Sequence, residues 1–243
     1  MKIFACYSIK GGVGKTAAAV NLAWQSANGG ARTLIWDLDP QAASTFYFRI
    51  AAKVKGGGKK LVRGKTEIDP LIRGTDFLGL DLLPGDFSYR KMDAALESTS
   101  KPARQLARLL EPLADEYDHL ILDCAPSISR TSESIFVAAD ALLVPTIPTP
   151  LSLRTLEQLA NHLRKKGPKR LRLMPFFSMV DRRKSLHREI VANADKRFLR
   201  TAIPFSTLVE RMGIHRAPLG AYAPRCEPAL AYEALWREAL ARF

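Results

Sequence analysis

Short apolar runs recur along the chain, and segments of mixed polarity separate them. Most of these runs are apolar throughout and do not alternate between apolar and polar residues. They therefore resemble strands that are buried on both faces rather than strands with one solvent-exposed face. Such strands are typical of a parallel sheet that is covered by helices on both sides. The predicted strands are residues 3–7, 32–36, 80–84, 118–123, 141–144 and 171–177.

Amphipathic segments fill the intervals between these runs. In residues 151–165, apolar side chains recur at spacings of three and four, which is the pattern of a helix with one buried face. The predicted helices are residues 15–28, 42–52, 86–97, 103–115, 130–138, 151–165 and 184–199. Alternating strands and helices predict a doubly wound α/β fold, and the absence of an internal repeat or a clear boundary favours a single domain over residues 1–243.

The segment from Lys53 to Lys65 does not fit this alternation. It carries three consecutive glycines, residues 56–58, and six basic side chains. Because glycine runs resist regular structure and like charges repel, we interpret residues 53–66 as a mobile basic surface loop. A solvated loop is favoured over a specific DNA-binding element.

Composition narrows the class of protein. A chain of 243 residues with 47% hydrophobic content can bury a substantial core, and two small domains are not excluded. No apolar run approaches the roughly 20 residues that span a bilayer, and the N-terminus enters a strand at once, so we expect no secretory signal. Cys6, Cys124 and Cys226 lack metal-ligand spacing, which predicts free thiols in a reducing cytoplasm.

A glycine-rich turn joins the first predicted strand to the first predicted helix. Residues 8–16 read Ser-Ile-Lys-Gly-Gly-Val-Gly-Lys-Thr. Glycines allow successive backbone N–H groups to point inward, and the start of a helix favours an anion. Lys15 can then reach the outer phosphates of a nucleotide, and the Thr16 hydroxyl can bind Mg²⁺. The sequence therefore predicts a nucleotide site.

A second lysine, Lys10, directly precedes the glycines. With it, the stretch closely resembles the deviant Walker A motif of the ParA/MinD family of ATPases, and in particular the small, Soj-like partition ATPases. The resemblance implies that Lys10 crosses a dimer interface to the nucleotide of the partner. It also implies nucleotide contacts from Gly11, Gly12, Val13, Gly14 and Ala17. Ala17 stands where the family often has a hydroxyl residue, so we expect weaker nucleotide affinity.

Carboxylates at the ends of two predicted strands complete the expected chemistry. Asp123 ends an apolar strand, where it can hold Mg²⁺ through water, although an aspartate that only caps the turn is the alternative. Residues 122–127 are similar to the Walker B segment of the family, and residues 37–41 resemble its second signature. By that resemblance, Asp39 positions the attacking water and Asp37 supports the Mg²⁺ shell, while Lys10 and Lys15 offset charge on the phosphoryl group.

The resemblance extends into the C-terminal third. Residues 177–183, the pair Ile203-Pro204 and the pair Ala217-Pro218 are similar to segments that lie near the adenine and form the DNA-facing side in the family. The resemblance implies that Pro204 and Phe205 contact the adenine. No helix-turn-helix segment precedes the first strand, so the expectation is a small ParA-like protein without operator binding.

Positive charge is concentrated in the same part of the chain. The net charge is +13, and residues 164–225 hold sixteen basic but only four acidic residues. Such a patch predicts sequence-independent binding to duplex DNA, with RNA or anionic lipid as alternatives, and the scarcity of interleaved aromatic residues argues against stacking on single strands. The expected DNA contacts are Arg182, Arg183, Lys184, Arg188, Lys196, Arg197, Arg200, Arg211 and Arg216.

The lipid alternative depends on the C-terminal segment, because MinD relatives end in a basic amphipathic helix that docks on membranes. Residues 227–243 carry only two arginines against three glutamates. Leu235, Trp236, Ala239 and Leu240 fit a terminal helix that packs on the core. Membrane docking is therefore disfavoured.

These patterns together predict an ATP- and Mg²⁺-dependent partition or positioning ATPase. ATP would close a homodimer that coats DNA non-specifically, and a separate ParB-like or adaptor protein would stimulate an otherwise weak hydrolysis. The expected location is the cytoplasm, on the nucleoid. A MinD-like membrane switch and a P-loop metabolic ligase are the alternative functions.

Overall fold

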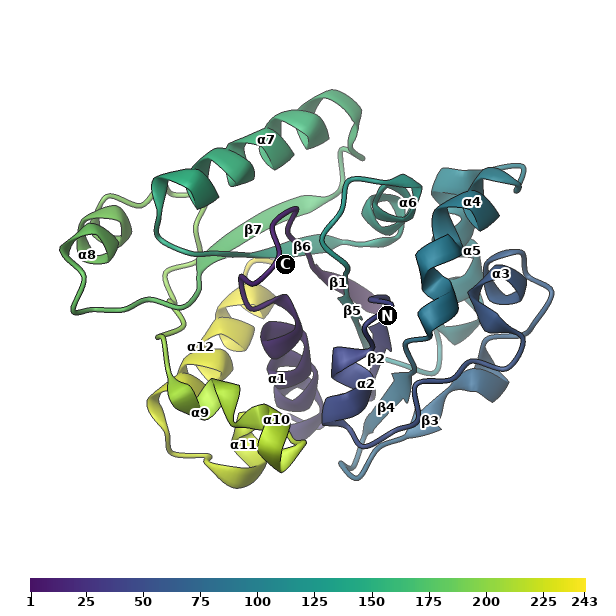
Figure 1. Cartoon of the computed structure of the whole chain (residues 1–243), viewed down its shortest axis with the longest axis horizontal. Helices are drawn as coiled ribbons and strands as arrows, with labels where there is room; N and C mark the ends of the chain where they lie inside the picture. Colours follow the sequence, from purple (N-terminus) through teal and green to yellow (C-terminus); the bar gives the residue numbers. More distant parts are fainter.

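A seven-stranded sheet forms the centre of the molecule in the computed structural model, which describes residues 1–243 (Figure 1). The strands are β1 (Lys2–Cys6), β2 (Thr33–Asp37), β3 (Arg73–Gly74), β4 (Leu80–Leu83), β5 (His119–Asp123), β6 (Ala141–Thr146) and β7 (Arg172–Phe177). Their order in the sheet is β3-β4-β2-β5-β1-β6-β7, and only β3 runs antiparallel to its neighbour. The predicted doubly wound, mostly parallel sheet is confirmed.

Two apolar layers cover the two faces of this sheet. One layer contains Trp36 and Leu122 and packs under α4, α5, α6 and α7; the other contains Phe4 and Ile121 and packs under α1 and α12. Figure 1 shows these helix groups on opposite sides of the strands. The helices are α1 (Lys15–Asn28), α2 (Ala43–Tyr47), α3 (Gly57–Val62), α4 (Met92–Glu97), α5 (Gln105–Leu110), α6 (Arg130–Ala138), α7 (Pro150–Lys166), α8 (Ser185–Ala192), α9 (Thr207–Glu210), α10 (Met212–His215), α11 (Leu219–Tyr222) and α12 (Glu227–Ala241).

The interpretation of residues 53–66 as a loop without regular structure is wrong. Residues 57–62 form α3, in which Leu61 and Val62 are fully buried. Gly58 lies so close to Tyr89 that an added Cβ would stand 2.5 Å from its ring. The segment therefore packs through apolar and small residues, while its lysines point outward.

Several other differences concern the length of elements. The predicted helix over 184–199 ends at Ala192, and residues 193–199 form turns and coil. The short strand β3 and the helical turns α9 to α11 lie outside the predicted elements. The three cysteines are free thiols, as expected.

The C-terminal helix α12 packs against the core. Leu235 and Ala239 are fully buried and Trp236 nearly so, and the Trp236 ring meets Phe4 edge-on at 4.9 Å between centroids. This confirms the prediction of a core-packed terminal helix. None of the helices has the length and apolar character that a membrane crossing requires.

The two edges of the sheet are closed in different ways. At one edge, β3 contributes only two residues. At the other, β7 contains Pro175, whose carbonyl oxygen accepts a hydrogen bond from Leu199 N at 2.7 Å, and Phe177 O accepts one from Ile203 N at 2.8 Å. The segment before α9 thus covers the outer side of β7.

Candidate nucleotide site

Three adjacent strands bring the predicted motifs together at one edge of the sheet. In the parallel register, Cys6 of β1 lies beside Asp123 of β5, which in turn lies beside Asp37 of β2. The glycine loop follows β1 directly. Since all three strands end at the same level, the loop and both carboxylates share one site at the carboxyl edge, where α/β proteins place their ligands.

The loop between β1 and α1 has the backbone of a phosphate cradle. Gly12 and Gly14 have φ angles of 69° and 92°, and Gly14 caps α1. A side chain at Gly14 would also place its Cβ 2.9 Å from Ser178 Oγ, whereas nothing lies within 4 Å of a Cβ built on Gly11 or Gly12. The loop is therefore open on the side of Gly11 and Gly12 and closed at Gly14.

Lys15 begins α1, and its side chain folds back over the loop. The side chain is buried and its ammonium donates a hydrogen bond to the Lys10 carbonyl oxygen at 3.1 Å. Burial lowers the pKa of Lys15, while the nearby Asp123 opposes that shift. The ammonium thus stands beside the loop where a phosphate would be its natural counter-ion.

Lys10 takes a different direction. Its ammonium donates a hydrogen bond to Ser152 Oγ at 3.4 Å, at the N-terminal end of α7 of the same chain. Ser152 in turn bonds the helix-capping Thr149. In this conformation, the Lys10 ammonium contacts α7, whereas the Lys15 ammonium contacts the backbone of the loop.

Asp37 is buried and its carboxylate is well satisfied. Its Oδ2 accepts hydrogen bonds from Thr45 N at 2.9 Å and Thr45 Oγ1 at 2.8 Å, and its Oδ1 accepts one from Asp39 N at 3.2 Å. Burial raises the pKa of Asp37 even though these donors lower it. The role that the structure displays for Asp37 is to hold the start of α2 against the sheet.

Asp123 is equally buried but only half satisfied. Its Oδ2 accepts a hydrogen bond from Ser44 Oγ at 2.6 Å, and its Oδ1 has no partner. Burial, and then the neighbouring Asp37, raises the pKa of Asp123. An unpaired buried acceptor is costly, and Mg²⁺ is commonly held by one or two carboxylates together with phosphate oxygens. The residues present therefore fit a Mg²⁺ ion next to Thr16.

Asp39 lies at the rim of the site. Its Oδ1 accepts a hydrogen bond from Gln41 N at 2.9 Å, and the residue is partly exposed. Unlike Asp37 and Asp123, it is therefore open to water. The water-positioning role of Asp39 and the Mg²⁺-supporting role of Asp37 stay predictions.

Ser44 and Thr45 were missed by the sequence analysis. Each donates its hydroxyl hydrogen bond to one of the two buried carboxylates, and Thr45 Oγ1 also accepts a bond from Gly85 N at 2.8 Å. The signal was two consecutive hydroxyl residues in the helix that follows the aspartates, because serine and threonine inside a short helix are otherwise unfavourable.

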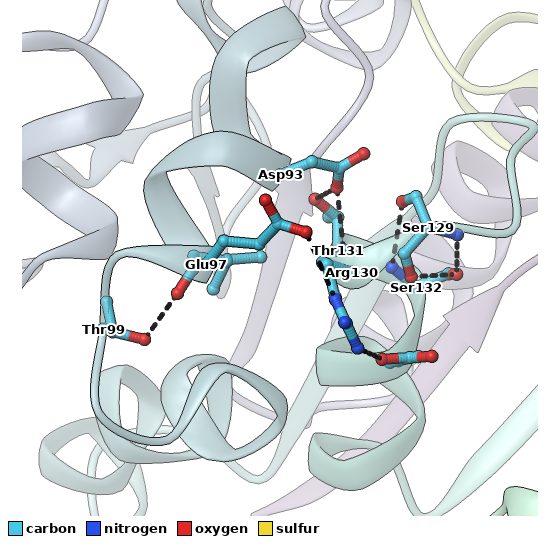
Figure 2. Close-up of polar contacts among 9 residues, drawn as sticks. Asp93, Glu97, Thr99, Ser129, Arg130, Thr131 and Ser132 are labelled. Atoms are coloured by element: carbon cyan, nitrogen blue, oxygen red, sulfur yellow. Dashed lines mark hydrogen bonds and ion pairs between the residues drawn. The ribbon is translucent and has the colours of Figure 1, made fainter.

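The chain beyond Asp123 is anchored by α6. Ser129 and Ser132 form a reciprocal capping box at its start, and Asp93 of α4 accepts hydrogen bonds from Thr131 N at 2.9 Å and Thr131 Oγ1 at 2.6 Å (Figure 2). Arg130 bonds Glu133 at 2.9 Å. These contacts fix the turn that follows Asp123 against α4.

A small cavity adjoins the loop on the side of α12. It has a volume of about 50 Å³ and is lined by Gly14 and Ala17 of the loop and helix, and by Pro204 and Phe205. Phe205 is exposed and Pro204 is bridged to Val180. The structure thus brings the two expected adenine contacts to the phosphate loop. Whether they bind adenine stays a prediction.

The nine basic residues expected to contact DNA lie along one flank of the molecule. They occupy α8 and its neighbouring loops beside β7, and α9 and α10 below them (Figure 1). Three of them are already in ion pairs: Arg182 with Glu227, Arg183 with Asp181, and Arg197 with Asp195 and Glu157. Lys184, Lys196 and Arg211 are exposed and have no ion pair. The flank keeps a positive surface, but fewer of its charges are free than the sequence count implies.

The fold and this site define a P-loop nucleoside triphosphatase with a doubly wound sheet. Residues 1–171 match the AAA domain family. The chain is 30% identical over 250 residues to the sporulation initiation inhibitor protein Soj of Bacillus subtilis, covering 99% of this chain and 98% of Soj. The chain therefore belongs to this family, which includes the Soj/ParA partition ATPases, as its two-lysine loop indicated.

Solved structures show the same fold. A putative plasmid partition protein from Borrelia burgdorferi, bound to AMPPNP, has a TM-score of 0.85 at 22% identity and covers 100% of this chain and 99% of its own. Cobyrinic acid a,c-diamide synthase from Mycobacterium smegmatis, with an ATP analogue and magnesium, has a TM-score of 0.83 at 23% identity and covers 100% and 94%. The ligands of these neighbours agree with the expected ATP and Mg²⁺.

Proposed function

We propose that this protein is an ATP-dependent positioning ATPase that dimerises around ATP and binds DNA non-specifically. The observation that carries the proposal is the pair of lysines in one phosphate loop, Lys15 folded over its own loop and Lys10 directed out of it. An ordinary phosphate loop needs only the first of these. A second lysine is explained if it neutralises charge on a nucleotide held by a second copy of the chain.

Binding would use the groups that surround the loop. The backbone N–H groups of residues 11–16 and Lys15 would hold the phosphates, and Thr16 and Asp123 would hold Mg²⁺. When bound, ATP and Mg²⁺ supply the phosphoryl group and neutralise its charge. Asp39 would orient the water at the rim of the site, because it is partly exposed whereas Asp37 and Asp123 are buried. Asp37 would support this arrangement through its bond to Asp39 N.

The basic flank of residues 164–225 is the proposed DNA surface. Dimerisation would double the number of lysines and arginines that face one duplex, and affinity rises steeply with the number of phosphates neutralised. A partner protein of the ParB or adaptor type is proposed to stimulate hydrolysis. The proposed location is the cytoplasm, on the nucleoid.

One binding experiment tests this function against its alternatives. Purified protein with ADP, with ATP or with a non-hydrolysable analogue is offered duplex DNA and anionic liposomes. ATP-dependent binding to DNA, without binding to liposomes, is the expected result. The Lys15→Ala variant should lose phosphate contacts, and with them nucleotide affinity and DNA binding.

A metabolic ligase is the second candidate, because the cobyrinic acid synthase shares the fold. It would bind ATP without a need for the basic flank. Nucleotide binding by calorimetry, combined with no ATP effect on DNA affinity, would favour it over the positioning ATPase. Binding to liposomes instead would favour the MinD-like membrane switch.

A further inference from the structure

An open groove lies at the edge of the sheet opposite the nucleotide site. It has a volume of about 660 Å³ and runs between α5, the end of α6, the start of β1 and residues 168–170. Since β1 spans five residues between this groove and the phosphate loop, the two sites are separated by roughly 15 Å along that strand. Nothing in the proposed ATPase cycle uses this groove.

Two arginines on α5 and the turn before it line one wall of the groove. Arg104 and Arg108 are exposed and are spaced by four residues, so they lie on one face of the helix. Neither guanidinium takes part in any of the ion pairs of the molecule. Both charges are thus free to meet an anion.

A third arginine at the other end of the groove is different, because it is fixed in place. Arg170 donates hydrogen bonds to Asp140 Oδ1 at 2.9 Å and to Val137 O at 2.6 Å, and Asp140 also accepts a bond from Ile3 N at 2.9 Å. Its charge is therefore largely offset. The lining also contains the exposed Glu111, which takes part in no ion pair. Arg104 and Arg108 together therefore leave the unpaired side chains of the groove with one excess positive charge.

The floor between these arginines is apolar. It is formed by Ile3, Ala107, Leu110, Ala114 and Val137 and by Pro168. An apolar floor under two free guanidinium groups matches a ligand that has both carboxylates and apolar side chains. Duplex DNA offers phosphates but no apolar side chains, and its convex backbone would leave this concave floor uncovered.

We propose that this groove binds an acidic peptide segment of a partner protein, with apolar side chains on the floor and carboxylates paired to Arg104 and Arg108. Arginine pairs with carboxylates in a bidentate geometry, which gives such a site specificity for peptides over simple anions. None of the residues that line the groove belongs to the nucleotide site.

Fluorescence anisotropy of a short fluorescein-labelled peptide with interspersed glutamate and leucine residues tests the proposal on the full chain without nucleotide. The double variant Arg104→Gln/Arg108→Gln should weaken binding about tenfold or more, since two charge-assisted contacts are lost. The matched control is Lys55→Gln/Lys65→Gln, which removes the same charge from exposed lysines outside the groove. The control should change affinity less than about threefold.

A second variant, an altered peptide and a DNA competitor make the test decisive. Ala107→Phe fills the floor without changing charge and should also weaken the peptide, and a serine-for-leucine version of the peptide should bind less tightly to the unmodified protein. Equal losses in the arginine and lysine double variants would show general electrostatic attraction and overturn the proposal. Displacement of the peptide by duplex DNA at equal concentration would overturn it too, in favour of a nucleic-acid surface. Thermal melts confirm that each variant is folded, and because no nucleotide is added, failure of the ATPase proposal would not affect the result.

Discussion

The two buried carboxylates differ at the level of single atoms in how well they are satisfied. Asp37 receives three hydrogen bonds from the protein, whereas Asp123 receives one and keeps one oxygen unpaired. A carboxylate with all of its near donors in place has little reason to bind a metal directly. Asp123 is therefore the stronger candidate for contact with Mg²⁺, and Asp37 the stronger candidate for holding α2.

Replacing Asp123 by asparagine should separate stability from function. The change removes a buried ionisable group whose pKa is raised by burial and by the neighbouring Asp37, so the ligand-free variant should be the more stable protein at neutral pH. It should also lose Mg²⁺-dependent nucleotide affinity. Urea unfolding without ligand measures the first effect, and calorimetry with ATP and Mg²⁺ measures the second.

Ser44→Ala provides the control for this prediction. It removes the Ser44 hydroxyl that donates to Asp123 and leaves the charge in place, so it should destabilise the ligand-free protein. If Asp123→Asn instead retained full Mg²⁺-dependent affinity, the metal-binding role of Asp123 would be wrong.

At the scale of elements, the sequence predicted the parts of the sheet that are buried on both sides. The predicted range 130–138 is identical to α6, and all six predicted strands are present with ends within one or two residues. These elements are specified by continuous apolar runs and by local capping, which are visible along the chain. The phosphate loop was equally predictable, because its glycines and lysine are consecutive.

Other features depend on contacts between distant residues and were not visible. The helix α3 exists because Leu61 and Val62 are buried and Gly58 fits against Tyr89, which is thirty-one positions away in the chain. Local propensity alone argued for a loop. The bonds of Ser44 and Thr45 to the two aspartates likewise depend on how α2 folds back over β5 and β2.

Gly58→Ala should destabilise the protein by about 1–3 kcal/mol, because a Cβ at this position would overlap the Tyr89 ring. Helix propensity alone predicts the opposite sign, since alanine favours a helix over glycine. Chemical denaturation measures the difference. Lys59→Ala, at an exposed neighbour in the same helix, should change stability by less than about 0.5 kcal/mol. A stabilised Gly58→Ala variant would mean that α3 does not pack on Tyr89.

The start of β5 carries a histidine that should make stability depend on pH. His119 lies edge-on to Phe4 and Trp236, and its Nδ1 is 2.8 Å from Ser26 Oγ. Burial lowers the pKa of His119, and nearby Lys2 lowers it further, while Asp118 opposes this. The unfolded chain therefore binds a proton more readily than the folded chain does.

The sign of the effect follows from this difference. The contribution of His119 to the free energy of unfolding is fully present above about pH 6.5, which is its pKa in the unfolded chain. This contribution is lost as the pH falls through the lower pKa of His119 in the folded chain. Free energies of unfolding from urea titrations should thus fall in the order pH 8, 6.5 and 5.5. The His119→Asn variant should show a smaller fall over the same pH range. Parallel pH profiles for the two proteins would assign the pH dependence to other groups.

On the scale of the whole molecule, Lys10 is the residue through which the proposed ATP-driven dimer can be tested. Lys10→Ala should keep nucleotide binding through Lys15 and the loop backbone, but lose ATP-driven dimerisation, and DNA affinity should fall with it. Light scattering with ATP reports the dimer, and a salt titration of DNA affinity reports the number of phosphate contacts.

Ser152→Ala is the matched control, because it removes the contact that Lys10 makes within its own chain. It frees the ammonium without removing it, so ATP-driven dimerisation should persist. A Lys10→Ala protein that dimerises like the parent would leave this lysine as a surface charge and would favour the metabolic ligase.

The edges of the sheet also restrict how copies of this molecule can associate. A long unpaired edge strand is a template for backbone pairing between molecules and hence for aggregation. Here one edge ends in the two-residue β3 with the exposed Arg73, and the other carries a proline and has carbonyl groups occupied by the segment 199–203. Neither edge offers a row of free donors and acceptors to a second sheet. Contacts between copies therefore have to use side chains rather than backbone pairing, which favours reversible association over aggregation.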